Sequence, residues 1–260
     1  MKRHLIEVNI ADFPRQLQPY LNGAAVYDTS CSQAARVYFL DKGEGFYLKR
    51  AAKGSLTKEA VMTDFFHRKG LATEVLAYEH DEYDWLLTKK ALGEDCTDPM
   101  YLSEPEQLCD VTASLLRQLH DVDISDCPIN RTIDYLATAR NNYKLQRYDT
   151  TLFPDNWGYT SPEEAWAEIE ANGKYLQADT LLHGDYCLPN IMLNNWQFSS
   201  FIDLDTAGMG DKHVDLFWGM WSLQFNLKTD RYCQRFLDAY GRDGIETERF
   251  RTVAAVEVFG

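Results

Sequence analysis

The chain has 260 residues, 45% of them hydrophobic and 13% aromatic, which is typical of a soluble globular protein large enough for two lobes. No run approaches the roughly 18 apolar residues of a membrane-spanning helix, and no apolar block follows the charged start as it would in a signal peptide. The formal net charge of −14 disfavours nucleic acid and anionic membranes as partners and favours a polycationic small molecule.

Strand signals dominate the first third of the chain. Apolar and β-prone residues predict strands over 34–40, 45–49, 74–79 and 83–88. The turn-forming residues 41–45 predict a hairpin between the first two of these strands. Residues 57–69 predict a helix that ends at Gly70, and residues 89–93 predict a hinge.

Helix signals dominate the rest of the chain. Ser103-Glu104-Pro105-Glu106 has the form of a capping box with proline at the first helical position, and apolar residues then recur at helical spacing from Leu108 to Leu119. Ser161-Pro162-Glu163-Glu164 repeats this start signal, and an apolar helix is expected from Val214 to about Phe225. A strand-rich front and a helix-rich back predict an α+β fold with two lobes, 1–92 and 93–260.

Six cysteines are scattered along the chain without a CxxC pair or a dense framework. Such a distribution predicts reduced thiols and a cytoplasmic protein. We expect a monomer or a weak dimer. The cysteines are Cys31, Cys96, Cys109, Cys127, Cys187 and Cys233.

Residues 183–205 carry the strongest functional signal. Within this stretch, Asp185 is followed five residues later by Asn190 and thirteen residues after that by Asp203. The apolar runs on either side of Asn194-Asn195 predict a strand, a turn and a strand, which would fold Asp203 back beside Asp185. In kinases, an aspartate accepts the proton of the attacking hydroxyl, while an asparagine and a second aspartate hold Mg²⁺. The spacing therefore predicts phosphoryl transfer.

The run HGDYCLPNIML together with FIDL resembles the signature of the aminoglycoside 3′-phosphotransferases. The resemblance implies an α+β, bilobal protein-kinase-like fold with a strand-rich N-terminal lobe and a helix-rich C-terminal lobe. It also implies Mg²⁺ and ATP (GTP is an alternative), and phosphorylation of the 3′-hydroxyl of an aminoglycoside, which confers antibiotic resistance. One step departs from the family, because Leu204-Asp205-Thr206 stands where a Leu-Gly-Arg step is usual. An arginine is missing and a carboxylate is added, which leaves the acceptor open.

The resemblance also assigns residues to the nucleotide. Lys49 ends the predicted strand 45–49 and would bind phosphates while pairing with Glu59 of the following helix. Ser30 and Ser32 lie where a phosphate-covering loop is expected, although no GxGxxG is present.

Further roles concern the catalytic loop and the acceptor. We expect His183 to orient the loop through hydrogen bonds, with proton transfer as the alternative. The resemblance implies that Asp215 braces the loop, with a simple charge at a helix N-terminus as the alternative. It implies that Glu257, near the chain end, binds an acceptor ammonium. Asp205 is interpreted as a metal ligand, an amine contact or a solvated turn residue. Other acidic candidates for the acceptor site are Asp155, Glu163, Glu164 and Glu168.

Three alternatives remain open at this stage. The first is a kinase of another small hydroxylated amine or sugar on the same fold. The second is a metal-dependent hydrolase, although its candidate ligands lack HxH or HExxH spacing. The third, a nucleotide-binding module without catalysis, is disfavoured because Lys49, Asp185, Asn190 and Asp203 occur together. The hydrolase ligands would be His183, Asp185, Asp203 and His213.

Overall fold

The computed structural model describes residues 3–148 and 158–260, which form two compact units. The N-terminal unit comprises residues 1–94 and 192–205, and the C-terminal unit comprises residues 95–191 and 206–260. The sequence placed 192–205 in the second lobe, but this segment packs with the first. The backbone N–H of Phe201 donates to the carbonyl of Leu71 at 2.8 Å, and the Phe201 ring packs edge-on against Phe66.

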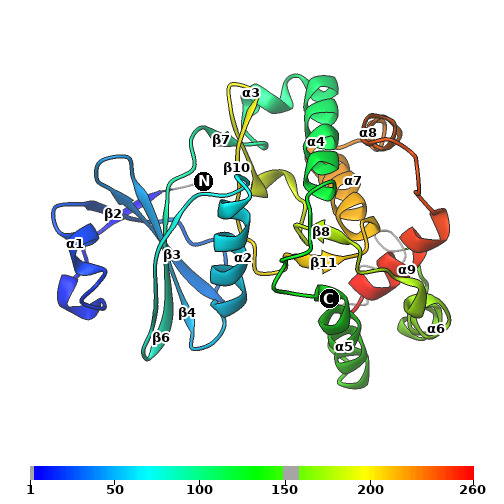
Figure 1. Ribbon diagram of the computed structural model, residues 1–260, viewed down its shortest axis with the longest axis horizontal. Helices are drawn as coiled ribbons and strands as arrows, with labels where there is room; N and C mark the ends of the chain where they lie inside the picture. The colour runs from blue at the N-terminus through cyan, green and yellow to red at the C-terminus, as the bar shows by residue number, and fades with distance from the viewer. Residues whose placement is uncertain (1–2, 149–157) are drawn as a thin grey trace. The chain divides into compact units, whose positions relative to one another are not determined.

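An antiparallel sheet of six strands forms the N-terminal unit, in the order β1-β2-β3-β4-β6-β5. Helix α2 lies beside this sheet (Figure 1). The elements are β1 (His4–Ile6), η1 (Ile10–Asp12), α1 (Gln18–Leu21), β2 (Ala25–Asp28), β3 (Ala35–Asp41), β4 (Phe46–Ala52), α2 (Thr57–Arg68), β5 (Val75–His80), β6 (Tyr83–Lys89) and β10 (Gln197–Phe201). The predicted strands and the helix at 57–69 are therefore present, with ends that differ by at most three residues.

Alternation of side chains along the strands explains the core of this unit. Leu40 on β3, Leu48 on β4 and Leu87 on β6 are fully buried. Successive side chains of a strand point to opposite faces of the sheet, so each strand contributes every second residue to this core. The same alternation sets Lys49 on the opposite face from Leu48, directly across from Leu86 of β6.

The motif hairpin is built from β9 (Ile191–Asn194) and β10. Its turn residues are Asn195 and Trp196, one position later than the predicted Asn194-Asn195. Both have positive φ angles, 51° and 68°, which matches the twist of a two-residue hairpin. The second strand ends at Phe201, earlier than the expected Leu204, because Asp203 adopts a left-handed φ of 62° that a strand does not accommodate.

Helices make up most of the C-terminal unit. Helix α4 lies next to α7 and α8, and α9 packs on α6 and α7 (Figure 1). Two strands, β7 (Glu94–Asp95) and β9, straddle a boundary between the units. The other elements are α3 (Pro99–Leu102), α4 (Pro105–His120), α5 (Arg131–Lys144), α6 (Pro162–Asn172), η3 (Gly173–Tyr175), β8 (Thr180–Leu182), η4 (Leu188–Asn190), β11 (Gly208–Gly210), α7 (His213–Leu227), α8 (Cys233–Tyr240) and α9 (Thr247–Glu257).

The two predicted capping boxes had different outcomes. At α6, the Ser161 hydroxyl accepts the N–H of Glu164 at 3.1 Å, and the Glu164 carboxylate accepts the N–H of Thr160, so this helix begins as predicted. At α4 the prediction was wrong in detail. Ser103 ends the preceding helix α3, its hydroxyl donates to the carbonyl of Met100, and α4 begins at Pro105 without a side-chain cap.

All six cysteines are free thiols. No helix within the described residues combines the length and the apolar character needed to cross a bilayer.

Candidate active site

The N-terminal unit brings together Lys49, Glu59 and Asp203. The Lys49 ammonium lies 2.8 Å from Glu59 Oε2 and 2.7 Å from Asp203 Oδ1. Strand β4 supplies the lysine, the first turn of α2 supplies the glutamate, and the segment after β10 supplies the aspartate. Three segments far apart in sequence therefore converge on one ammonium group.

Burial separates the two carboxylates of this cluster. Glu59 is buried and Asp203 is half-exposed. Burial raises the pKa of Glu59 to about 7, and the charges of Asp203 and Asp205 raise it as well, whereas Lys49 lowers it. The pKa of Lys49 is raised in turn, because attraction to Glu59 and Asp203 outweighs its own desolvation. Asp205 therefore adds negative charge to the cluster around Lys49.

Ser30 and Ser32 follow β2 in the segment expected to cover phosphates. The Ser30 hydroxyl accepts the N–H of Val37 at 2.9 Å, and the Ser30 N–H donates to Asp28 Oδ1. Asp28 also pairs with Arg36 at 3.0 Å. These bonds shape a turn between β2 and β3. Ser32 is exposed in the bend that follows.

In the C-terminal unit, Asp185 and Asn190 occupy one short loop after β8. The Asn190 amide nitrogen donates to Asp185 Oδ2 at 2.9 Å and to the Asp185 carbonyl at 3.0 Å. Helix η4 spans Leu188–Asn190 and closes the loop, so that the side chains five positions apart meet. Because these bonds use the amide nitrogen, they leave the amide oxygen of Asn190 to a metal.

Asp215, at the start of α7, holds the backbone of this loop. Its buried carboxylate accepts the N–H of His183 at 2.8 Å, the N–H of Gly184 at 2.7 Å, and His120 Nε2 at 3.2 Å. Burial alone would raise the pKa of Asp215, but the bonds from His120 and Gly184 and the charges of His120 and His183 hold it below its usual range. These bonds favour the bracing role over a simple charge at the helix start.

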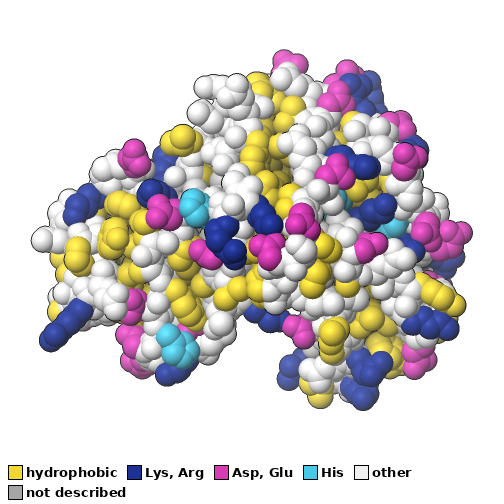
Figure 2. Space-filling model, in the orientation of Figure 1, with side chains coloured by type: hydrophobic (Ala, Val, Ile, Leu, Met, Phe, Trp, Pro, Cys, Tyr) yellow, Lys and Arg dark blue, Asp and Glu magenta, His cyan; other side chains and the backbone are white. Residues whose placement is uncertain are grey.

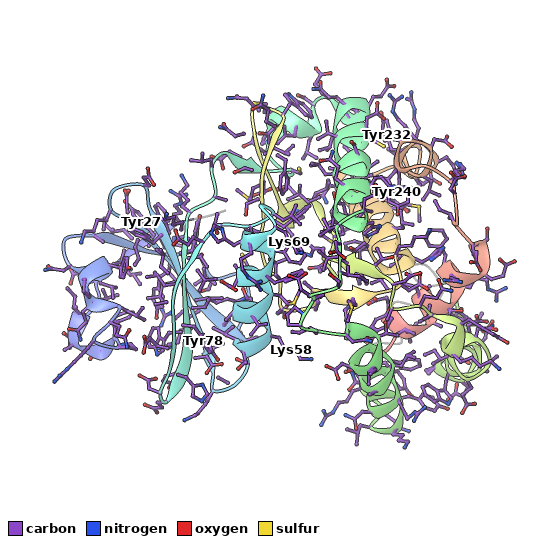
Figure 3. The ribbon with its side chains drawn as sticks, viewed as in Figure 1. Tyr27, Lys58, Lys69, Tyr78, Tyr232 and Tyr240 are labelled. Carbon is purple, nitrogen blue, oxygen red and sulfur yellow. The ribbon has the colours of Figure 1, made fainter. Side chains whose placement is uncertain are left out.

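Sequence reasoning missed His120, the last residue of α4. Its Nδ1 lies 2.8 Å from the Tyr240 hydroxyl, and Figure 3 labels Tyr240 beside α4. Since a carboxylate only accepts hydrogen bonds, His120 Nε2 carries a proton and donates it toward Asp215. His120 lies 63 residues before His183, and no local pattern connects the two.

Gly184 and Thr206 explain the path of the loop. Gly184 has a φ of 86°, and a Cβ at this position would lie 2.2 Å from the Thr206 carbonyl oxygen. Only glycine fits there. Thr206 occupies the place of the missing arginine, and its hydroxyl donates to the His183 carbonyl at 3.5 Å.

Glu257, the last residue of α9, lies in the same unit as Asp185. Its carboxylate accepts the Tyr135 hydroxyl at 2.6 Å and a hydrogen bond from the Trp218 side chain. Burial raises the pKa of Glu257, and the charge of Asp185 raises it further, whereas the Arg131 charge lowers it. The Arg131 guanidinium also lies over the Tyr135 ring, 4.7 Å from its centroid. Tyr135, Trp218 and Arg131 were not anticipated from the sequence.

Two of the other acidic candidates support α6 and its neighbours. Glu164 Oε2 accepts the N–H of Thr160 at 2.9 Å, and Glu168 Oε1 accepts the Thr252 hydroxyl of α9 at 2.9 Å. Glu163 lies in the first turn of α6. Asp155 lies outside the described residues.

His213 is committed to structure, which weakens the hydrolase alternative. Its Nδ1 lies 2.6 Å from Asp211 Oδ1, and its Nε2 accepts the N–H of Glu246 at 2.9 Å. Asp211 Oδ2 in turn accepts Arg249 Nη1. Both ring nitrogens of His213 are used. Across residues 3–148 and 158–260, no three His, Cys, Asp or Glu side chains gather as metal ligands.

Comparison with known proteins agrees with this geometry. A model described as the phosphotransferase enzyme family (APH) matches residues 31–251. A Lactococcus lactis protein named "Probable aminoglycoside 3′-phosphotransferase" is 46% identical over 257 residues, 98% of each chain. An Enterococcus faecalis aminoglycoside 3′-phosphotransferase is 30% identical over 83% of this chain and 86% of its own.

Solved structures show the same fold. A crystal structure of an aminoglycoside 3′-phosphotransferase of type VIII superposes with a TM-score of 0.79 at 24% identity, covering 96% of this chain and 99% of its own. An aminoglycoside phosphotransferase from Streptomyces rimosus, solved with ADP and streptomycin, gives a TM-score of 0.75 at 18% identity, covering 97% and 99%. The predicted α+β protein-kinase-like fold is confirmed. The chain belongs to the aminoglycoside phosphotransferase (APH) family of phosphotransferase enzymes.

Proposed function

We propose that this protein transfers the γ-phosphate of ATP to a hydroxyl of an aminoglycoside antibiotic, the 3′-hydroxyl first among them, and so confers resistance. The observation that carries the proposal is the Lys49 ammonium held between Glu59 and Asp203 at 2.8 and 2.7 Å. A kinase needs a phosphate-binding lysine fixed in this way. The 46% identity to the Lactococcus lactis relative supports the aminoglycoside as acceptor.

The nucleotide is the part of the substrate that Lys49 would bind. Its ammonium is a compact positive charge, which suits the α- and β-phosphates of ATP or GTP. Ionised Glu59 keeps the ammonium in place. Backbone N–H groups near Ser30 and Ser32 would cover the phosphates, because the turn between β2 and β3 has no GxGxxG motif.

Asn190 and Asp203 are the residues that we propose for Mg²⁺. An amide oxygen and a carboxylate are hard oxygen donors, and Mg²⁺ usually takes few protein ligands and keeps several waters. The donor set therefore fits the ion. When bound, Mg²⁺ would neutralise charge on the transferring phosphoryl group.

Asp185 is the group that we propose to accept the proton of the acceptor hydroxyl. The amide of Asn190 fixes Asp185 Oδ2, and Asp215 fixes the backbone on which Asp185 is carried. Phosphoryl transfer depends mainly on positioning, so a rigid carboxylate of modest basicity is sufficient. His183 contributes its backbone N–H to that rigidity.

The acceptor would be cationic. Glu257 and Asp185 repel one another electrostatically, and an ammonium near both would relieve that repulsion. The net charge of −14 acts in the same direction at long range. Acidic and basic side chains are interspersed on the face shown in Figure 2. We place the reaction in the cytoplasm, with a monomer or weak dimer as the acting species.

Release of ADP, measured with a panel of aminoglycosides and simpler amino alcohols, tests the function. We expect aminoglycosides with a 3′-hydroxyl to be turned over, and their 3′-deoxy counterparts to be inert. Turnover of other amino alcohols alone would instead assign a different acceptor to the same chemistry. The comparison between aminoglycosides and other amino alcohols is needed because Asp205-Thr206 replaces the usual Gly-Arg of the family and leaves the acceptor open.

Asp185→Asn tests the catalytic role in the same assay. We expect kcat to fall by roughly 10²–10⁴-fold, the usual loss on removing a general base, while ATP still binds. Asp238→Asn is a matched control, because Asp238 is exposed on α8 and pairs with Arg242, four residues further along the chain. Near-normal turnover by Asp185→Asn would contradict the assignment.

A further inference from the structure

A row of three aromatic rings runs along α7 in the C-terminal unit. The rings of Trp218 and Trp221 meet edge to face with centroids 5.4 Å apart, and those of Trp221 and Phe225 stack in parallel at 5.0 Å. Their spacing of three and then four residues places all three on one side of the helix. We call Trp218, Trp221 and Phe225 the aromatic row.

Only the inner end of the aromatic row touches the hydrophobic core, where the partly buried Trp218 packs against the core cluster of this unit. Leu216 and Leu223 bury the other side of α7, with relative exposures of 0% and 1%. Along the row, by contrast, Trp218 and Trp221 are only partly buried, and Phe225 is 55% exposed. Exposure to water therefore increases along the row from the core-packed Trp218 to Phe225.

The inner end of the aromatic row reaches the acceptor end of the site. The Trp218 side chain hydrogen-bonds the Glu257 carboxylate, and the charge of Asp185 acts on that same carboxylate. The row thus begins beside Glu257, in the unit that also holds Asp185. A molecule whose reacting hydroxyl lies at Asp185 could extend past Glu257 and over the rings.

The outer end of the row already holds an ammonium. The Lys228 Nζ lies 4.2 Å from the centroid of the Phe225 ring. Lys228 caps α7 in a left-handed conformation, with φ of 58°, which returns its side chain over the ring. The face of Phe225 is therefore accessible to a cation, and the negative face of an aromatic ring attracts one.

We propose that the aromatic row is a subsite for the ring of the acceptor farthest from the reacting hydroxyl. The apolar face of an aminosugar ring packs on the face of Phe225 that Lys228 covers, at the outer end of the Trp221–Phe225 stack, and an ammonium of that ring takes the place of Lys228. The ligand class is an amine-bearing oligosaccharide of at least three rings. This inference rests on the proposed function, since the acceptor must first be anchored at Asp185 and Glu257.

Substitutions at Phe225 test the subsite with little risk to folding, because the side chain is exposed. The acceptors are a three-ring aminoglycoside and its two-ring fragment that keeps the reacting ring. For Phe225→Ala we expect the KM of the three-ring acceptor to rise roughly 5- to 30-fold, with kcat and the KM of ATP unchanged. The two-ring fragment should show no change.

Conservative variants separate stacking from simple apolar contact. Phe225→Tyr keeps an aromatic face and should retain the wild-type KM, whereas Phe225→Leu keeps the apolar bulk and should lose most of the affinity. Trp221→Phe should behave as Phe225→Tyr. The matched control is Tyr175→Ala, since Tyr175 is 59% exposed and also carries a lysine over its ring, but belongs to η3.

Calorimetric binding of the three-ring acceptor makes the outcome independent of turnover. If wild type binds the acceptor without phosphorylating it, and Phe225→Ala weakens binding, the proposed function fails and the subsite stands. If Phe225→Ala leaves both KM and Kd unchanged, or weakens both acceptors equally, the subsite is refuted while the function stands. If the wild type binds no aminoglycoside, both fail.

Discussion

Asp215→Asn should disrupt the catalytic loop, although it replaces only one carboxylate oxygen by an amide nitrogen. In the native side chain, Oδ1 accepts the N–H of Gly184, and Oδ2 accepts both the N–H of His183 and His120 Nε2. An amide can present only one oxygen. Its least costly orientation turns the NH₂ group toward Gly184, where two donors then face each other in a buried site.

The size of the effect follows from these three bonds. One buried N–H left without an acceptor costs about 1–3 kcal/mol, and the two remaining bonds lose the part of their strength that comes from the charge. We therefore expect the free energy of unfolding to fall by about 2–4 kcal/mol. That is a large share of the roughly 5–15 kcal/mol available to a typical domain. Because Gly184 precedes Asp185, kcat should fall as well.

Urea unfolding followed by circular dichroism measures the stability change, and ADP release measures kcat. Asp238→Asn, on the exposed face of α8, should leave the unfolding curve unchanged. A pH series adds a second readout. Since the pKa of Asp215 is lowered in the folded state, its contribution is present above about pH 4 and is lost as the pH falls through the folded-state pKa. Asp215→Asn should lack that acid-dependent loss. Wild-type stability and kcat in this variant would refute the bracing role.

Three more predictions concern the N-terminal unit. Lys49→Met should lower kcat/KM for ATP by on the order of 10²-fold, because the phosphates lose their fixed cation. Wild-type values of kcat/KM in steady-state kinetics would exclude phosphate binding by Lys49. Activity in wild type should rise as the pH increases through about 7, where Glu59 ionises. Asp205→Gly removes a negative neighbour, so this acidic limb of the profile should move to lower pH; an unmoved or upward-shifted limb would contradict the coupling. Gly93→Ala should destabilise the protein, as measured by thermal melting. The left-handed φ of 80° at Gly93 alone costs an alanine about 1–3 kcal/mol. The new Cβ would also lie 2.0 Å from the Leu193 carbonyl oxygen, which adds a steric clash.

Local patterns were enough to predict much of the fold. The hairpin at 41–45, helix α2 and the start of α6 each depend on neighbouring residues, so their signals lie within a few positions of one another. Lys49 and Glu59 were paired because Glu59 lies near the start of the helix that follows the strand of Lys49, as the family resemblance implies. The capping box at Ser103 failed because a short helix, α3, competes for the same serine.

Long-range partners could not be found in this way. His120 reaches Asp215, and Tyr135 reaches Glu257, across 95 and 122 residues. Nothing in either local sequence marks the partner. Asp205 was considered as a contact for the acceptor because of its place in the motif. Its charge instead raises the pKa of Glu59. This effect depends on residues 192–205 belonging to the N-terminal unit, which the local sequence does not indicate.

The division of the chain at 94/95, 191/192 and 205/206 also limits how such an enzyme can be recombined. Neither unit is a continuous stretch of sequence, so one crossover between two related genes cannot exchange either unit intact. A chimera joined at residue 94 would pair the Lys49 and Glu59 of one parent with the Asp203 and Phe201 of the other. The contact of Lys49 with Asp203 therefore depends on two separate segments, whereas α7 and α9 lie together within the single segment 206–260.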